Sequence, residues 1–391
     1  MFKKFAENNS LVPIILAALA IGVGLQEYLG GPHRYANFVI FRNSFRHLIN
    51  HLNLYQGFSD EKDFFLYSPS FALLMAPFVY LPDWLGIVVW CGVNSLAVYF
   101  AIRLLPATDA RKRLLITFII LFDFISSQQN LQTNPLIASF TVLAFVCFER
   151  RMVFFAALFV MMAFYVKIFG LAAASLFLLY PQRIRFLTSL LFWGTVLFLA
   201  PLLAVPFREL ISLYASWYRL TMAFHENASV NAASSLRSAD ISLSVMSWLR
   251  IWFGLKVEAV YVQLAGAVLF CIPFLCTKNF VDLKFRTIVL SSLLIWCVIF
   301  NHIAESPSYI IAMMGVAIWF VNEKRNALTI GLLILALVLT GLSSTDAFPA
   351  AIRNQFVKPL VLKAFPCILI WCFIQFRLLT FTAKKSGDRA T

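Results

Sequence analysis

The sequence predicts an all-α integral membrane protein with about twelve transmembrane helices and with short re-entrant and interfacial helices on its outer face. Of its 391 residues, 61% are hydrophobic and only 13% are charged, and the mean hydropathy is +0.83. One span needs roughly 20 apolar residues, so a dozen spans occupy roughly 240 positions and leave about 150 for loops. We therefore expect residues 1–391 to form a single multi-span membrane domain, without room for a separate soluble domain.

Twelve apolar runs are candidate spans, although several of them are short. They cover residues 11–29, 84–105, 113–127, 134–149, 152–166, 168–181, 186–205, 258–277, 286–302, 308–321, 327–344 and 359–380. The first run has two readings, a signal peptide or a span, and its length and the absence of an Ala-x-Ala pattern in Gly30 to Arg34 favour the span. The stretch from Tyr67 to Pro82 is apolar too, but Pro69 and Pro77 interrupt it, so we expect a re-entrant piece there.

Charge distribution predicts the orientation. The formal net charge is +14, but the basic residues occur as pairs and triplets between apolar runs rather than as the continuous basic face that binds nucleic acid. With a cytoplasmic N-terminus, the inner side receives 19 of the 32 basic and six of the 18 acidic residues, so it nets +13 and everything else nets +1. This obeys the positive-inside rule and predicts that both termini are cytoplasmic.

Two long loops, residues 30–68 and 206–257, fall on the predicted outer face, where long loops usually indicate function. In the first, the apolar positions between residues 38 and 52 follow helical spacing with Arg42 and His47 among them, which predicts an interfacial amphipathic helix. The helix is either only a membrane anchor, or Arg42 or His47 also contacts a lipid phosphate.

Carboxylates and amides follow on the same face. Asp60 and Asp63 precede Tyr67 at the start of the predicted re-entrant piece. They belong either to a solvated loop or to a site at the bilayer surface, where one of them acts as general base. The amide-rich stretch that includes Gln129 and Asn134 either satisfies two helix ends or binds the hydroxyls of a sugar-like substrate.

Ionisable residues in or near apolar runs are further candidates for function. A lone charge in hydrocarbon costs at least a few kcal/mol, so such residues need a reason to be there. The 28 residues from Val153 to Tyr180 are too long for one span and too short for two, so we expect Lys167 at a bend near the outer surface, either holding a phosphate or snorkelling to the interface. Asp123 needs a partner or a proton, and the sequence identifies no partner.

Two further stretches contribute candidates on the outer face. His302 and Glu305 are spaced i, i+3, which suits an acid–base pair, although two polar helix ends explain part of the pattern. Arg237 in the second loop is either a phosphate ligand or a surface arginine. The seven cysteines lie in apolar stretches without zinc-type spacing, so we expect reduced packing residues and no metal. No nucleotide-binding fingerprint, zinc helix or nucleophile elbow occurs in the sequence.

Four stretches, in their order and spacing, resemble glycosyltransferase family 87. They are Asn37 to Phe41 with Leu54-Tyr55, Tyr67-Ser68-Pro69 with Pro77 and Leu81-Pro82, Gln129-x-x-x-x-Asn134, and Lys167 before a span that ends in basic residues. The resemblance covers most of the chain. It implies the class C membrane glycosyltransferase fold and a polyprenol-phosphate-mannose-dependent mannosyltransferase type of enzyme, and the stretch from Asn301 to Tyr309 resembles a bacterial subgroup.

One departure from the family concerns the catalytic base. Members usually have an aspartate early in the first outer loop, and the matching position here is Asn37, whose amide cannot accept a proton. We expect a relocated base, with Asp63 first, Glu305 second and Asp60 as a further candidate. The predicted substrate-binding residues are Asn37, Arg42, Tyr67, Gln129, Asn134, Lys167, Arg237 and His302.

The sequence as a whole predicts a hexosyltransferase of the bacterial plasma (inner) membrane. It moves a mannose-like sugar from a polyprenyl phosphate donor to a lipid-linked or envelope glycan acceptor on the periplasmic face, in contact with membrane lipids, without nucleic acid and without a cofactor or metal. One alternative is a lipid or solute transporter or flippase, with Asp123 and Lys167 in its pathway, although the sequence shows no repeated half. The other is a catalytically inactive scaffold of an envelope-synthesis complex.

Overall fold

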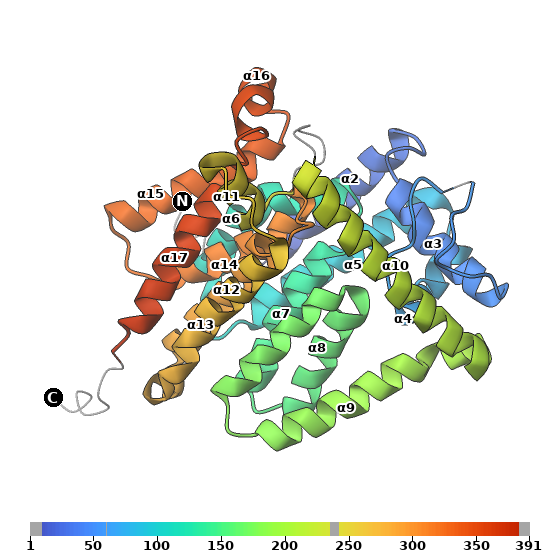
Figure 1. The fold of residues 1–391 in the computed structure, drawn as a ribbon, viewed down its shortest axis with the longest axis horizontal. Coiled ribbons are helices and arrows are strands. Elements are labelled where there is room, and N and C mark those ends of the chain that lie inside the picture. The colour runs from blue at the N-terminus through green and yellow to red at the C-terminus, as the bar shows by residue number, and fades with distance from the viewer. Residues whose placement is uncertain (1–9, 60, 235–241, 383–391) are drawn as a thin grey trace.

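A computed structural model describes residues 10–59, 61–234 and 242–382, and all regular structure in these ranges is helical (Figure 1). The predicted all-α class is therefore confirmed, and no strand occurs in the part of the chain that the structure describes. A bilayer leaves no water for backbone groups, so apolar segments satisfy their backbone hydrogen bonds internally as helices.

Each of the twelve predicted runs contains helix. These segments are α2 (Leu11–Leu29), α5 (Asp83–Leu104), α6 (Ala110–Gln129), α7 (Asn134–Glu149), α8 (Val153–Val166), η2 (Ile168–Leu179), α9 (Arg183–Leu199) with η3 (Ala200–Leu203), α12 (Ala259–Cys271) with η4 (Ile272–Leu275), α13 (Leu283–Ile299), α14 (Tyr309–Asn322), α15 (Ala327–Leu335) with η7 (Ala336–Gly341) and η8 (Leu342–Ser344), and α17 (Phe365–Leu379). Shorter pieces are η5 (Thr277–Val281), η6 (Ser306–Ser308), α16 (Ala350–Ile352) and η9 (Arg353–Val357).

Four of the described helical segments are long and apolar enough to cross a membrane by themselves: residues 11–29, 83–104, 183–203 and 327–344. Six further apolar helical segments of the described chain have 10–17 residues. The membrane character of the chain is supported, and the number of twelve crossings stays a prediction.

The predicted amphipathic helix in the first outer loop is α3 (Ala36–Ile49). Its apolar side chains Phe38, Phe41 and Leu48 are buried within the protein, and Phe41 packs edge-on against the rings of Tyr67 and Phe71. The helix was correctly predicted, but its apolar face contacts protein rather than lipid. Its role at the membrane surface stays a prediction.

The stretch after Tyr67 forms two short helices, α4 (Pro69–Leu74) and η1 (Ala76–Tyr80). Ser68 begins α4 because its hydroxyl accepts the backbone N–H of Phe71 at 3.2 Å and Pro69 occupies the first helical position. The broken helix agrees with the expected interruption by proline, and its re-entry into a bilayer stays a prediction.

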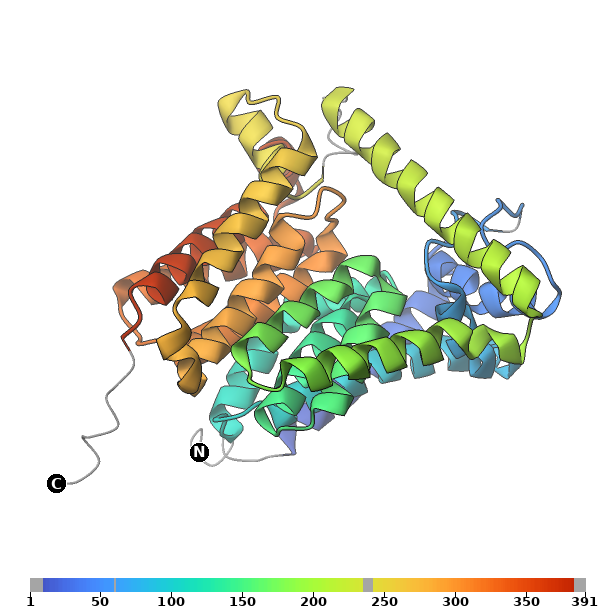
Figure 2. The same ribbon diagram turned by 60° about the horizontal axis from the view of Figure 1, so that its bottom comes forward.

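The second outer loop contains the largest departure from the prediction, a single 28-residue helix, α10 (Phe207–Ser234), followed by α11 (Val245–Phe253). Figure 2 shows α10 leaving the end of α9 and extending across the molecule toward α11. Its buried residues Leu210, Leu213 and Trp217 follow helical spacing between polar residues. A search for continuous apolar runs missed this helix because charged residues such as Glu209 and Arg219 interrupt its sequence.

Candidate functional site

Lys167 lies at a sharp reversal of the chain, where the sequence predicts a bend. Helix α8 ends at Val166, Lys167 is extended with φ −146° and ψ 130°, and η2 begins at the next residue. The two helices then pack so closely that a Cβ on Gly170 would lie 2.5 Å from the carbonyl oxygen of Ala163. Only glycine permits this approach, so Gly170 allows the chain to fold back and to place Lys167 at the tip.

The Lys167 ammonium contacts the amide-rich stretch before α7. Its Nζ donates to Asn134 Oδ1 at 2.9 Å and to Gln132 Oε1 at 3.4 Å, and it lies 5.9 Å from the centroid of the Tyr67 ring. These two hydrogen bonds use two of the three N–H donors of the ammonium and leave one for a ligand oxygen. The contacts bring three predicted binding residues together: Tyr67, Asn134 and Lys167.

The loop at residues 130–134 is held in place from three sides. Asn37 Nδ2 donates to the Asn130 carbonyl at 2.8 Å, Trp90 Nε1 donates to the Leu131 carbonyl at 2.9 Å, and Thr133 Oγ1 donates to the Tyr67 hydroxyl at 3.4 Å. Leu131 adopts a positive φ of 49° that turns the chain. Asn37 therefore belongs to the same site, where its amide group positions the loop that carries the Lys167 ligands.

Glu305, in the other half of the chain, acts electrostatically on this group. Burial lowers the pKa of Lys167 to about 8, and the negative charge of Glu305 opposes this shift. The same carboxylate acts electrostatically on Tyr67. Glu305 itself is exposed, and its charge acts on the half-buried Lys167 ammonium. The site thus pairs a fixed cation with an accessible carboxylate.

Other predicted residues in the described part of the chain form no hydrogen bond with Lys167 and differ in their surroundings. Asp63 is exposed, and its Oδ1 accepts the backbone N–H of Phe64 at 2.8 Å. Gln129 is half-buried at the last position of α6. Arg42 forms a salt bridge with Asp83 in the first turn of α5, where a carboxylate also favours the helix dipole. Asp60 and Arg237 lie outside the described residues.

His302 has partners that the sequence did not indicate. Its Nε2 lies 3.1 Å from His225 Nδ1 on α10, and its Nδ1 lies 3.0 Å from Gln263 Nε2 on α12. The histidine of the expected His302–Glu305 pair therefore contacts α10 and α12, and no hydrogen bond or ion pair between the His302 and Glu305 side chains occurs among the described residues. These partners are 77 and 39 residues away from His302 in the sequence, so no local pattern reveals them.

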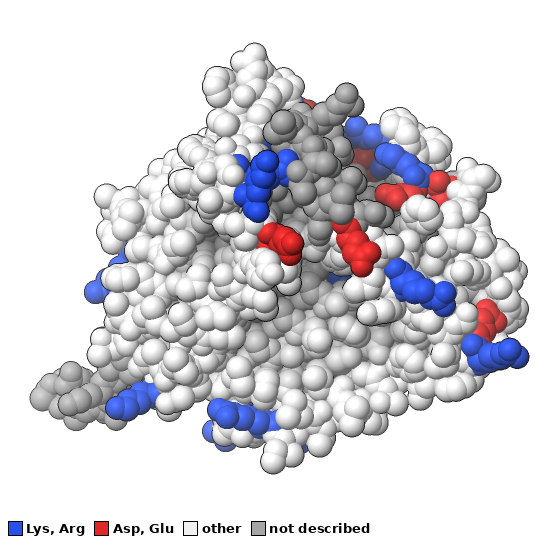
Figure 3. All heavy atoms as spheres, viewed as in Figure 1, with Lys and Arg blue, Asp and Glu red and all other residues white. Residues whose placement is uncertain are grey.

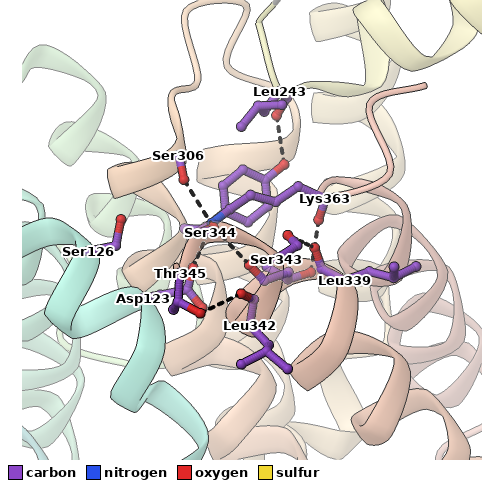
Figure 4. Close-up of polar contacts among 12 residues, drawn as sticks. Asp123, Ser126, Leu243, Ser306, Leu339, Leu342, Ser343, Ser344, Thr345 and Lys363 are labelled. Atoms are coloured by element: carbon purple, nitrogen blue, oxygen red, sulfur yellow. Dashed lines mark hydrogen bonds and ion pairs between the residues drawn. The ribbon is translucent and has the colours of Figure 1, made fainter. Parts of the chain in front are cut away.

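Asp123 finds its partner 240 residues away. Both Asp123 and Lys363 are buried, at 0% and 4% exposure, and Lys363 Nζ donates to Asp123 Oδ1 at 2.9 Å (Figure 4). Lys363 Nζ also donates to the hydroxyl of Ser344, which accepts a further hydrogen bond from Ser306 Oγ at 3.2 Å. Because Ser306 directly follows Glu305, this buried network ends beside the carboxylate of the site.

Charged side chains are sparse on the surface drawn in Figure 3, and several acidic and basic residues surround a hollow on the face that α10 crosses. Most of the remaining surface in that view is uncharged, which suits contact with lipid. In this view the charged side chains lie around the hollow and along the edges of the molecule, with uncharged surface between them.

The sequence profile of glycosyltransferase family 87 matches residues 65–300, which is more than half of the chain. The chain belongs to glycosyltransferase family 87. This confirms the predicted family. The family 87 match includes Tyr67, Asn134 and Lys167, and it ends five residues before Glu305. No curated protein matches the chain.

Within a family 87 enzyme, the chemistry of this group suits glycosyl transfer. An ammonium fixed by two amide oxygens stabilises negative charge on a leaving group, and an accessible carboxylate accepts the proton of an attacking hydroxyl. The described residues hold no cluster of three or more His, Cys, Asp or Glu side chains that suits a metal ion.

Proposed function

We propose that the protein transfers a hexose, mannose-like in type, from a polyprenyl phosphate donor to a lipid-linked or envelope glycan acceptor. The observation that carries this proposal is the half-buried Lys167 ammonium, which is fixed by Asn134 and Gln132 and is acted on by the charge of Glu305. A lipid donor fits a chain that has apolar helices around this group and lacks a nucleotide-binding fingerprint.

The proposed reaction uses these groups in one displacement. The acceptor hydroxyl oxygen attacks the anomeric carbon while its proton passes to the Glu305 carboxylate. The bond between the anomeric carbon and the phosphate oxygen breaks, and its electron pair leaves with the polyprenyl phosphate. Lys167 donates its third N–H to that phosphate and offsets the developing charge, which is most effective where water is excluded. Asn134 and Gln132 hold the ammonium in position.

Glu305 is preferred over Asp63 as the base because its charge acts on Lys167 and Tyr67, whereas Asp63 is exposed and bonded to its neighbouring backbone. Glu305→Gln is expected to lower the rate of sugar transfer by about 10²- to 10⁴-fold, since the amide keeps the size but cannot accept a proton. The matched control, Asp63→Asn, should stay near the parent rate. Loss of activity in Asp63→Asn alone would assign the base to Asp63 and remove Glu305 from that role.

The protonation state of Lys167 predicts an alkaline limit to catalysis. With a pKa lowered by burial from 10.5 to about 8, the ammonium loses its proton as the pH rises through about 8, and a neutral amine holds phosphate poorly. We expect kcat/KM for the donor to fall above that pH. In Lys167→Arg the guanidinium stays charged, so the residual activity should lack this alkaline limb. The measurement is the pH profile of kcat/KM between pH 6 and 10.

The site is proposed to face the periplasm of a bacterial inner membrane, with both termini in the cytoplasm. The support is the positive-inside distribution of charge and the position of Asn134, Lys167 and Glu305 at the predicted outer ends of their segments. Reporter fusions at Ser10 and after Arg389 should both report the cytoplasm. Opposite sides for the two fusions would mean an odd number of crossings and a different side for the site.

A further inference from the structure

A cavity with charged side chains in its wall lies at the other end of the bundle from Lys167. Its volume is about 640 Å³, and it is formed where α5 ends, α6 begins and α7 ends. The Lys167 site adjoins the first residue of α7, and the cavity adjoins its last turn. Since α7 has 16 residues, a rise of 1.5 Å per residue separates the two places by about 24 Å. The cavity is therefore distinct from the proposed active site.

The cavity is lined by four basic side chains and one carboxylate: Arg103, Lys112, Arg113, Arg150 and Asp109. The carboxylate of Asp109 caps α6, where its Oδ1 accepts the backbone N–H of Lys112 at 2.8 Å. The Lys112 ammonium is fixed at the wall by the Ala107 carbonyl at 3.1 Å. Arg103 and Arg113 both line the cavity, where their like charges repel each other and Asp109 offsets this only in part. A bound anion would relieve this repulsion.

An apolar stripe on α5 leads directly to the cavity. Val89, Val93, Leu96 and Phe100 are 37%, 39%, 55% and 44% exposed, and Arg103 continues the same 4-3-4-3 spacing. These positions share one helix face, because residues spaced three and four apart lie above one another. The stripe belongs to a helix that is long and apolar enough to cross a membrane, so it faces the acyl chains of lipids. Arg103 then lies at the level of their headgroups.

We propose that this cavity binds the headgroup phosphate of an anionic phospholipid whose acyl chains lie along the stripe of Val89, Val93, Leu96 and Phe100. A phospholipid fits better than a free phosphate because the stripe and the basic cavity are continuous on one helix. The lipid belongs to the predicted cytoplasmic leaflet, opposite to the donor and acceptor. The expected consequence is stabilisation of the junction between α5, α6 and α7.

Thermal unfolding of the purified full chain in neutral detergent tests the proposal. Phosphatidylglycerol should raise the melting temperature of the parent in a saturable manner, whereas phosphatidylcholine at the same concentration should not. Arg103→Gln with Arg150→Gln should weaken the apparent affinity for phosphatidylglycerol at least tenfold, and Arg103→Lys with Arg150→Lys should restore most of it. Size-exclusion chromatography without added lipid checks that each variant is folded.

The matched control removes two arginines elsewhere on the same predicted face, in Arg183→Gln with Arg185→Gln. Both are exposed, and neither lines the cavity. This variant should keep the parent response. An equal loss in the control would show unspecific attraction between a basic surface and anionic lipid and would overturn the site. An equal, saturable shift with inorganic phosphate alone would overturn the role of the apolar stripe and of the lipid.

Discussion

Lys167→Met is expected to reduce sugar transfer at least about 100-fold, because it removes the positive charge that offsets the leaving phosphate. Methionine keeps the length and the apolar stem of lysine, so packing in the reversal between α8 and η2 changes little. Loss of the N–H donors leaves the oxygens of Asn134 and Gln132 without this partner, which costs about 1–3 kcal/mol of stability. Lys167→Arg keeps the charge and should retain part of the activity.

The assay is transfer from a polyprenyl phosphate-linked hexose, with the folded fraction of each variant determined by thermal unfolding. Lys324→Met is a matched control, since Lys324 is exposed on the predicted inner face and should tolerate the change. Parent-level transfer by Lys167→Met would remove the lysine from the site. The proposed site would then have no fixed cation for the donor phosphate, and the proposed reaction mechanism would be wrong.

The position of Lys167 was predictable because it depends on chain length. A run of 28 residues from Val153 to Tyr180 is too long for one span and too short for two. In the structure the chain reverses its direction at Lys167. The amide-rich stretch before Asn134 was predictable for the same local reason, since polar residues between two apolar helices mark their ends. The number of crossings cannot be obtained in this way, because several helices are short and their tilt depends on packing.

Long-range partners were not predictable. The electrostatic action of Glu305 on Lys167 could not be seen in the sequence, because 138 residues separate the two. Lys363 was not recognised as the partner of Asp123, because it lies in a turn before α17 and carries no local pattern. The amphipathic helix α10 escaped a search for apolar runs. The Asp123–Lys363 contact was not predictable because it joins segments that are distant along the chain.

Lys363→Met is expected to destabilise the protein by about 3–5 kcal/mol, the largest effect on stability among the changes considered. The substitution leaves the Asp123 carboxylate at 0% exposure without the ammonium that now donates to its Oδ1 at 2.9 Å. It also removes the hydrogen bond to Ser344, and therefore the support that Ser306 gives to the turn beside Glu305. Transfer activity per folded molecule should fall as well.

The double variant Asp123→Asn with Lys363→Met decides whether this loss comes from an unpaired buried charge. Without the carboxylate no charge is left uncompensated, so the double variant should be more stable than Lys363→Met alone, with a coupling energy of about 0.5–3 kcal/mol. Lys358→Met, at an exposed position five residues earlier, should stay within about 0.5 kcal/mol of the parent. These variants and Asp123→Asn alone are compared by unfolding in detergent, induced by heat or by denaturant. If the effects of the two single substitutions simply add, Asp123 and Lys363 do not stabilise the folded protein as a pair. The ion pair would then not be what stabilises the hydrogen-bond network beside Glu305.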